Sequence, residues 1–147
     1  MKLAIGSDHA GFQIKSGLVR WLRSAAGGRH SVNDLGCPGA ESCDYPDYAA
    51  LVSRAVASGR ASRGILICGT GIGMGMAANK VKGIRAAVTW NPEVAALAVE
   101  HNKANILCLP ARFINGPLAR RMVRVFLKTH FAGGRHARRV RKIGMMD

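Results

Sequence analysis

The fold is decided by residues 64–75, which read GILICGTGIGMG. The first five residues form a short run that is apolar on both faces, as is typical of a strand buried inside a parallel sheet. Glycines then follow at alternate positions, which lets the backbone approach a ligand closely, and the N–H groups at the start of the next helix face such a ligand. The stretch therefore predicts a strand, a ligand-binding loop and a helix, in that order.

The glycine loop is of a kind that binds phosphate or the oxyanion of a reaction intermediate. It lacks the third glycine of the G-x-G-x-x-G dinucleotide motif, whether the motif is counted from Gly69 or from Gly71. It is not a P-loop either, because no Gly-Lys-Ser/Thr closes it. A flavodoxin-like protein that holds FMN or NAD is therefore a disfavoured alternative.

Short apolar runs and helical patterns alternate on both sides of this stretch. Strands are predicted at residues 2–5, 32–35, 64–68, 84–88 and 105–109. Apolar residues at helical spacing lie within residues 14–25, 48–55 and 94–101, and a last long helix opens near Pro117. This alternation predicts an α/β fold: a Rossmann-like three-layer αβα sandwich with a five-stranded parallel sheet and a C-terminal helical tail. Residues 1–147 form one domain, in which residues 133–147 are a basic extension.

The composition fits one soluble globular domain. The chain has 147 residues, of which 48% are hydrophobic and 20% charged, and this balance excludes wholesale disorder. No apolar run approaches the roughly 20 residues that span a bilayer, and the apolar start is too short for a signal peptide. We therefore expect a cytoplasmic protein that does not enter a membrane.

The charge is strongly positive, with a formal net value of +14. Residues 111–147 hold ten Lys or Arg and one acid, Asp147. Such a field attracts nucleic acids, acidic membranes and small phosphorylated metabolites alike. A nucleic-acid-binding module in residues 112–142 is one alternative, but no helix-turn-helix, zinc knuckle or aromatic stacking platform accompanies the charge. We expect no nucleic-acid partner.

The four cysteines are Cys37, Cys43, Cys68 and Cys108. They form no CxxC pair, and no His follows at the spacing of a zinc site. Free thiols are expected in a chain without a secretory signal, so the sequence predicts neither a disulfide framework nor a metal.

Polar residues follow the first and third predicted strands, where ligands of parallel sheets bind. Asp8 and His9 follow the first strand, although Asp8 could simply cap the next helix. Cys68 ends the third strand, where the next helix and nearby cations would favour a thiolate that acts as nucleophile or general base.

Two further groups admit both a functional and a structural interpretation. His101 lies on the apolar stripe of its helix, which is more typical of a core residue, but it is followed by Asn102 and could reach a cleft. Arg135 and Arg139 are four residues apart and share a helix face, so they could grip a phosphate or simply belong to a solvated tail.

Taken together, these features resemble the type B ribose-5-phosphate isomerase family, which also includes allose-6-phosphate and galactose-6-phosphate isomerases. The matching segments run in family order over nearly the whole chain: GSDHAG (6–11), DYPDYA (44–49), GILICGTGIG (64–73), AANK (77–80), GIRA (83–86), HNKAN (101–105) and GGRH (133–136).

The resemblance implies an aldose–ketose isomerase that converts ribose 5-phosphate to ribulose 5-phosphate by ring opening and a cis-enediolate, without cofactor or metal. It implies Cys68 as the general base and His101, helped by Thr70 and Asp8, as the ring-opening acid. The remaining implied residues are Gly69, Gly71, Ile72 and Gly73 for the enediolate oxyanion, Tyr45 and Asn102 for sugar hydroxyls, and His9, Arg112, Arg135 and Arg139 for the phosphate. Some relatives carry a Glu in the glycine loop, but Met74 stands there in this chain, so the Cys-type mechanism is the one implied.

The resemblance also implies a homodimer with shared active sites, in which the basic extension packs on the partner subunit and supplies its arginines; the dimer could pair further into a tetramer. A hexose 6-phosphate, such as allose or galactose 6-phosphate, is the alternative substrate. It differs from the pentose phosphate by one carbon, and only the depth of the cleft distinguishes the two. Two departures from the family, the +14 charge and Trp90 after the fourth strand, leave this choice open.

Overall fold

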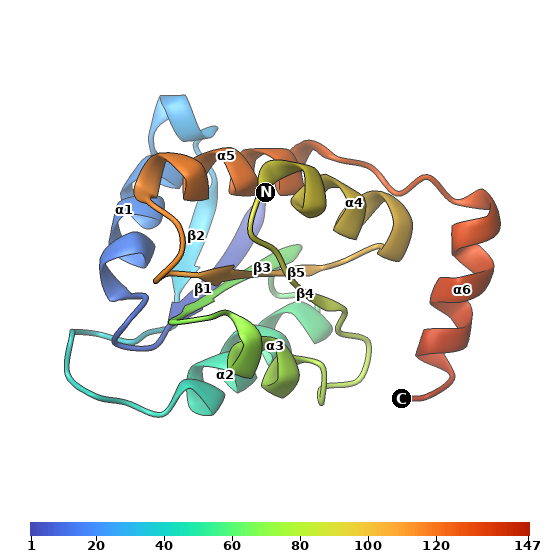
Figure 1. Ribbon diagram of the computed structural model, residues 1–147, viewed down its shortest axis with the longest axis horizontal. Helices are drawn as coiled ribbons and strands as arrows, with labels where there is room; N and C mark the ends of the chain where they lie inside the picture. Colours follow the sequence, from blue (N-terminus) through green and yellow to red (C-terminus); the bar gives the residue numbers. More distant parts are fainter.

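The computed structural model describes all residues, 1–147, as an alternation of strands and helices (Figure 1). The strands are β1 (Lys2–Ser7), β2 (Ser31–Asp34), β3 (Arg63–Cys68), β4 (Ala86–Val88) and β5 (Ile106–Pro110). The helices are α1 (Phe12–Arg23), α2 (Tyr45–Ala57), α3 (Ile72–Ala78), α4 (Pro92–Asn102), α5 (Gly116–Lys128) and α6 (Gly134–Gly144), with a short 3₁₀ turn, η1 (Ala25–Gly27), after α1. All strand pairs are parallel, and the strand order is β2-β1-β3-β5-β4. The predicted α/β fold with a five-stranded parallel sheet is therefore confirmed.

Two predicted boundaries were wrong, and each has a local cause. The strand expected at residues 84–88 begins only at Ala86, because the backbone N–H of Arg85 donates to the Asn105 side chain (2.8 Å) and not to a neighbouring strand. The helix expected to include Ala25 ends at Arg23. Ser24 takes an extended conformation there, and its hydroxyl donates to the Trp21 carbonyl (2.7 Å), which stops the helix.

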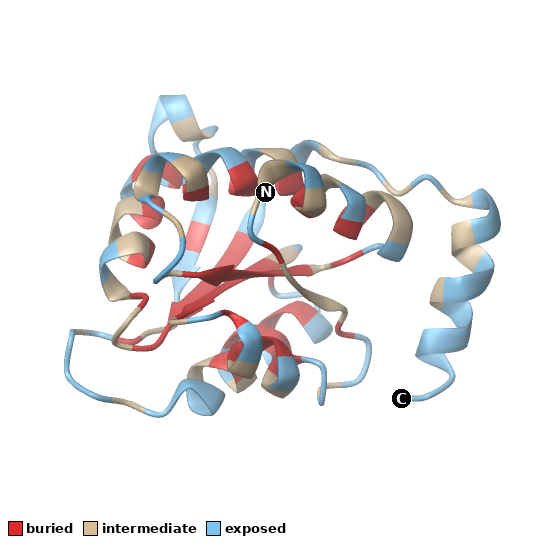
Figure 2. Cartoon of the chain, viewed as in Figure 1, coloured by how far each residue is buried: buried red, intermediate tan, exposed pale blue.

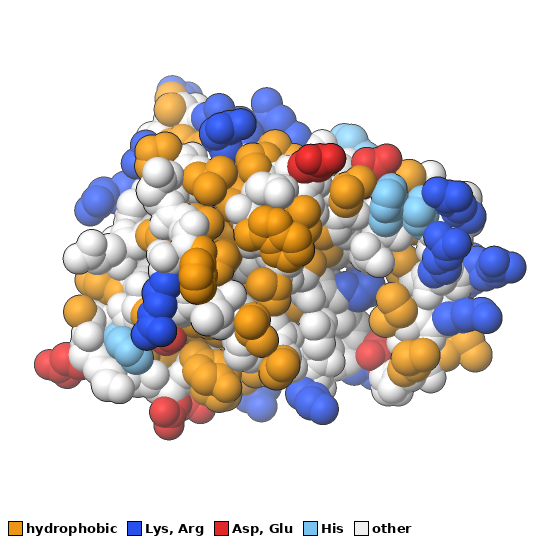
Figure 3. All heavy atoms as spheres, in the orientation of Figure 1, with side chains coloured by type: hydrophobic (Ala, Val, Ile, Leu, Met, Phe, Trp, Pro, Cys, Tyr) orange, Lys and Arg blue, Asp and Glu red, His pale blue; other side chains and the backbone are white.

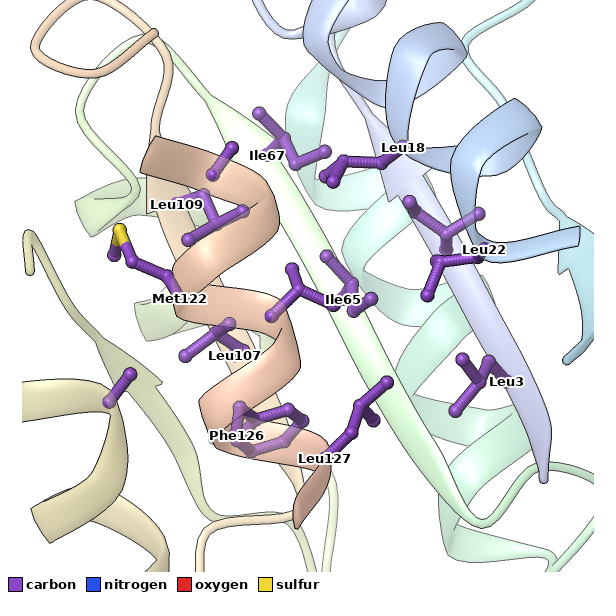
Figure 4. Packing of buried hydrophobic residues seen from close by; sticks show 14 of the residues in the cluster. Leu3, Leu18, Leu22, Ile65, Ile67, Leu107, Leu109, Met122, Phe126 and Leu127 are labelled. Carbon is purple, nitrogen blue, oxygen red and sulfur yellow. The ribbon is translucent and has the colours of Figure 1, made fainter. Parts of the chain in front are cut away.

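Helices cover both faces of the sheet, which explains why its strands are apolar on both sides. A cluster of 20 buried residues packs α1, α4 and α5 on one face, and a cluster of 13 packs α2 and α3 on the other. Figure 4 shows the first cluster, where Phe126 and Met122 of α5 lie over Leu107 and Leu109 of β5. In Figure 2 the buried positions accordingly concentrate in the strands and on the inward faces of these helices.

The C-terminal helix α6 stands apart from this sandwich (Figure 1) and has no buried residue (Figure 2). It packs against α4, and the segment before it is attached by a hydrogen bond from the Ala132 N–H to the Glu100 carbonyl (3.0 Å). At its far end the Asp147 carboxylate accepts the Gly83 N–H (3.0 Å). The predicted helical tail is thus present and rests on the side of its own domain.

The strand order reverses between β1 and β3. From β1 the chain moves outward to β2, and it then returns to the other side of β1 to build β3, β5 and β4. In open parallel sheets the loops at such a reversal diverge and leave a crevice at the carboxyl ends of the two strands. None of the helices combines the length and the apolar character that crossing a membrane requires.

Candidate active site

Cys68 is the last residue of β3 and lies at this crevice, with only 4% of its surface exposed. The backbone N–H of Gly71 donates to its sulfur (Gly71 N to Cys68 Sγ, 3.1 Å). Gly71 reaches this position with a φ of 75°, a left-handed conformation that favours glycine, and it packs against the backbone of Leu109. The glycine at 71 therefore turns the loop back onto the Cys68 sulfur.

The other N–H groups of the glycine loop divide into two sets. The Ile72 N–H donates to the Thr70 hydroxyl (3.3 Å), so this group and that of Gly71 are engaged within the loop. The N–H groups of Gly69, Thr70 and Gly73 have no acceptor elsewhere in the chain. The loop thus keeps unpaired backbone donors next to a thiol, an arrangement suited to an anionic oxygen.

The turn after β1 packs directly against β3. The Asp8 N–H donates to the Ile67 carbonyl (3.1 Å), and the Asp8 carboxylate accepts the Gly11 N–H (3.0 Å). A side chain at Gly11 would come within 2.5 Å of the Ile67 carbonyl oxygen, so only glycine allows this approach. Asp8 is buried in the turn before α1. The N-cap residue of α1 is Gly11, which has no side chain to cap the helix. The structure therefore places Asp8 beside the end of β3, where its carboxylate also holds the turn that leads into α1.

Three more predicted residues lie around the same loop. A Cβ built at Gly73 would meet the Tyr45 ring at 2.7 Å, and one built at Gly69 would meet the Arg112 side chain at 3.2 Å. The Arg112 N–H also donates to the Gly69 carbonyl (3.1 Å). His9 follows Asp8, and its Nδ1 accepts the backbone N–H of Cys43 (3.4 Å). One chain therefore brings together Asp8, His9, Tyr45, Cys68, the residues of the glycine loop and Arg112.

His101 and Asn102 lie at the opposite edge of the sheet. Helix α4 starts beyond the carboxyl end of β4, where Asn91 caps it by accepting the Val94 N–H (2.8 Å), and its 11 residues run back for roughly 16 Å. The chain then enters β5 at Ile106, which pairs with Gly64 at the start of β3, whereas Cys68 pairs with Pro110 at the other end. A single chain thus does not bring His101 and Asn102 to Cys68.

The two predicted phosphate-binding arginines of the tail share the edge where His101 lies. Arg135 and Arg139 belong to α6, which packs on α4, and His136 between them stacks on His101 with ring centroids 4.2 Å apart. In Figure 3 the Lys and Arg side chains of this tail form a basic cluster next to the pale-blue histidines.

His136 was given no role by sequence reasoning. It lies 35 positions from His101, so no spacing rule connects the two, and only its place in the GGRH segment marked it. Its partial burial, followed by the charges of His101, Arg135 and Arg139, lowers its pKa below the ordinary value. The neutral imidazole is therefore its favoured form in the stack.

None of the five cavities of the molecule is lined by Cys68. One cavity of about 420 Å³ lies between α6 and β4, and its lining includes Asn102 and Asp147. Another of the same volume is lined by Cys37, Cys43 and Tyr48. No group of three or more His, Cys, Asp or Glu side chains could share a metal ion. The predicted site residues therefore form two separate surfaces, one at each edge of the sheet.

Comparison with known proteins assigns the chain to a family. Residues 3–143 match the ribose/galactose isomerase family. Ribose-5-phosphate isomerase B of Escherichia coli is 43% identical over 146 residues, which cover 99% of this chain and 96% of that protein.

Solved structures agree with this match. Ribose-5-phosphate isomerase B of Clostridium thermocellum superposes with a TM-score of 0.95 at 49% identity and covers 99% of this chain and 97% of its own. Ribose-5-phosphate isomerase B of Mycoplasma genitalium, solved with bound ribulose-5-phosphate, has a TM-score of 0.92 at 43% identity, with coverages of 99% and 95%. The fold, the order of the site segments and these similarities lead to one conclusion: the chain belongs to the ribose/galactose isomerase family.

Proposed function

We propose that this protein interconverts ribose 5-phosphate and ribulose 5-phosphate. The observation that carries the proposal is the Cys68 sulfur, which accepts the Gly71 N–H and lies beside the unpaired N–H groups of the glycine loop. Aldose–ketose isomerisation needs a base next to an oxyanion site, and these groups supply both. The relatives named ribose-5-phosphate isomerase B, one with ribulose-5-phosphate bound, support this substrate.

In the proposed reaction Cys68, as the thiolate, moves a proton between C1 and C2 of the open sugar. The negative charge that develops on the sugar oxygen is stabilised by the N–H groups of Gly69, Thr70 and Gly73. Each well-placed donor of this kind contributes about 3 kcal/mol to transition-state stabilisation. The donors of Gly71 and Ile72, also expected to bind the oxyanion, instead order the sulfur and the Thr70 hydroxyl.

The remaining groups must come from a second chain, because His101 and Cys68 lie at opposite edges of one sheet. We infer a homodimer in which His101 and Asn102 of one subunit face the glycine loop of the other. There His101 would protonate the ring oxygen, with Thr70 and Asp8 of the facing chain nearby. A two-fold dimer contains two such composite sites.

Exposed apolar side chains support a second chain at the carboxyl edge of the sheet. Ile72 and Met76 of α3, Trp90 after β4 and Phe113 after β5 are between 50% and 72% exposed. Large apolar side chains that gather on a surface mark contacts with another protein. We infer that these residues lie in the dimer interface.

The phosphate would bind between positive groups from both chains. Arg112 and His9 lie on the glycine-loop side, and the hydrogen bond from Cys43 to His9 Nδ1 keeps the proton on Nε2, where it can be donated to an anion. Arg135 and Arg139 would come from the tail of the second chain, where their spacing places both on one helix face. Guanidinium groups bind phosphate through charge-assisted hydrogen bonds.

The test is ketose formation from ribose 5-phosphate, with allose 6-phosphate measured alongside, for the wild type, Cys68→Ala and Cys108→Ala. Cys68→Ala is expected to lose about 10²- to 10⁴-fold in kcat with little change in KM. Cys108 is the matched control, because it is fully buried in β5, where burial raises the pKa of its thiol.

Cys108→Ala should keep its kcat and lose only about 1 kcal/mol of stability. Equal activity of Cys68→Ala and the wild type would remove Cys68 from the mechanism. Faster turnover of allose 6-phosphate than of the pentose by the wild type would replace the proposed substrate by a hexose 6-phosphate.

A further inference from the structure

The loop between β2 and α2 holds two cysteines that line the same cavity. Cys37 is 2% exposed, and its thiol donates to the Gly39 carbonyl (Cys37 Sγ to Gly39 O, 2.8 Å). Burial, followed by the charges of Cys43 and Cys37, raises the pKa of the Tyr48 hydroxyl. All three side chains line the same cavity of about 420 Å³. Both cysteines therefore border one space that a small molecule can enter.

The protonation state of the Cys43 thiol depends on its neighbour Cys37. Burial, followed by the hydrogen bond to Cys37, raises the pKa of the Cys43 thiol. Cys43 thus rests as a thiol at neutral pH and becomes more reactive as the pH rises, because the thiolate is the attacking form.

The same loop touches the candidate active site. The backbone N–H of Cys43 donates to His9 Nδ1, and this contact is already long at 3.4 Å. Two residues after Cys43, Tyr45 begins α2 and lies against the glycine loop. A movement of Cys43 is therefore transmitted to His9, which we place at the phosphate.

We propose that Cys37 and Cys43 are a redox modification site, a dithiol that closes into an intramolecular disulfide and thereby weakens binding of the sugar phosphate. The oxidant is a low-molecular-weight disulfide. The Cys43 thiolate attacks it, forms a mixed disulfide and releases one thiolate; the Cys37 thiolate then attacks the Cys43 sulfur and releases the second. In total the two protein thiols lose two electrons and two protons, and the small disulfide is reduced to two thiols.

Closing the bond must displace Cys43. A disulfide holds its sulfurs about 2.05 Å apart, which is much closer than two thiols in hydrogen-bond contact. We expect the movement toward Cys37 to lengthen the contact between the Cys43 N–H and His9 Nδ1, which is 3.4 Å in the reduced protein. We expect KM for the sugar phosphate to rise roughly three- to tenfold, as for the loss of one hydrogen bond.

The bond itself is tested without any activity assay. The protein is incubated with oxidised glutathione at pH 7.5 and pH 9, its free thiols are blocked, and its peptides are identified by mass spectrometry. The expected product is a peptide pair joined between Cys37 and Cys43, formed faster at pH 9 and lost on treatment with dithiothreitol. Glutathione left on either cysteine as the final product, or two unmodified thiols at both pH values, would overturn the proposal.

The effect on binding rests on the proposed function and is measured separately. KM and kcat for ribose 5-phosphate are compared for oxidised and reduced wild type, Cys37→Ser and Cys43→Ser; two variants are used so that a folding defect in one is recognised. Oxidation of Cys68 would lower kcat in all three proteins, whereas a rise of KM confined to the wild type reports the disulfide. An unchanged KM in protein that carries the mapped disulfide would refute the link to His9. Failure of the reduced wild type to isomerise ribose 5-phosphate would instead refute the proposed function, and the peptide map would still decide whether the disulfide forms.

Discussion

The imidazole rings of His101 and His136 are stacked nearly parallel, with their centroids 4.2 Å apart and 4° between their planes. His101 lies in the last turn of α4 and His136 in the first turn of α6, so the stack joins the tail to the domain at the edge of the sheet away from Cys68. The tail therefore presents Arg135 and Arg139 next to the predicted ring-opening acid.

Docking of α6 on α4 should depend on pH through His136. The pKa of His136 is lowered in the folded chain by its partial burial and by the charges of His101, Arg135 and Arg139, although Glu100 opposes the shift. A lowered folded-state pKa means that the released tail binds more protons, so docking is strongest above the ordinary pKa of about 6.5 and weakens as the pH falls below it. Amide hydrogen exchange of residues 134–144 at pH 7.5 and 5.5, corrected for intrinsic rates, should show weaker protection at pH 5.5. His136→Gln should remove this difference, and a difference that persists in this variant would assign it to another group.

Mixed dimers test whether each active site takes residues from two chains. Cys68→Ala and His101→Asn are each expected to be inactive alone. Coexpressed in equal amounts, they form mixed dimers in which one of the two sites has both wild-type halves, so roughly a quarter of wild-type activity should return by random pairing. The matched control is Cys68→Ala with Asp8→Asn, which damages the same half-site and should stay inactive. Absence of recovery in the first mixture would mean that the sites are not shared in this way.

Arg139 should contribute to binding of the phosphate more than to chemistry. Arg139→Ala is expected to raise KM for ribose 5-phosphate roughly tenfold or more with a small effect on kcat, because a charge-assisted hydrogen bond contributes about 1.5–3 kcal/mol. Arg138→Ala is the control: it removes the same charge from a neighbouring, equally exposed position on another face of α6. Steady-state kinetics measure KM for both variants. Equal KM values would show that Arg139 attracts the phosphate only through its charge and makes no specific contact with it.

The ion pair between Lys15 and Asp34 should respond asymmetrically to mutation. The Lys15 side chain is 3% exposed and its Nζ contacts both Asp34 oxygens (2.6 and 2.8 Å), whereas the Asp34 side chain is 32% exposed. Asp34→Ala leaves a buried ammonium without a partner and should cost about 3 kcal/mol of unfolding free energy. Lys15→Met leaves Asp34 partly hydrated and still bonded to the Gly36 N–H (3.1 Å), so it should cost about 1 kcal/mol or less. Urea denaturation measures both, and equal losses would contradict the argument from burial.

Much of the fold could be predicted from local sequence patterns. The run from Gly64 to Cys68 is apolar at every interior position because helices cover both sheet faces, and this signal needs no knowledge of distant residues. The start of α5 near Pro117 can likewise be predicted from neighbouring residues, since Asn115 caps the helix by accepting the Leu118 N–H (2.9 Å). The start of β4 was missed because it depends on Asn105, twenty residues away, which takes the Arg85 N–H.

The sequence by itself determined the order of strands and helices, the glycine loop after Cys68 and the positions of the candidate catalytic residues, because these depend on residue type and short-range spacing. The tertiary structure alone decided which of these residues meet. It placed Asp8, Tyr45 and Arg112 against the glycine loop, but it carried His101 along α4 to the opposite edge, where it stacks on His136. The reason is that such meetings depend on strand order and helix direction, which arise from packing between segments far apart in the chain.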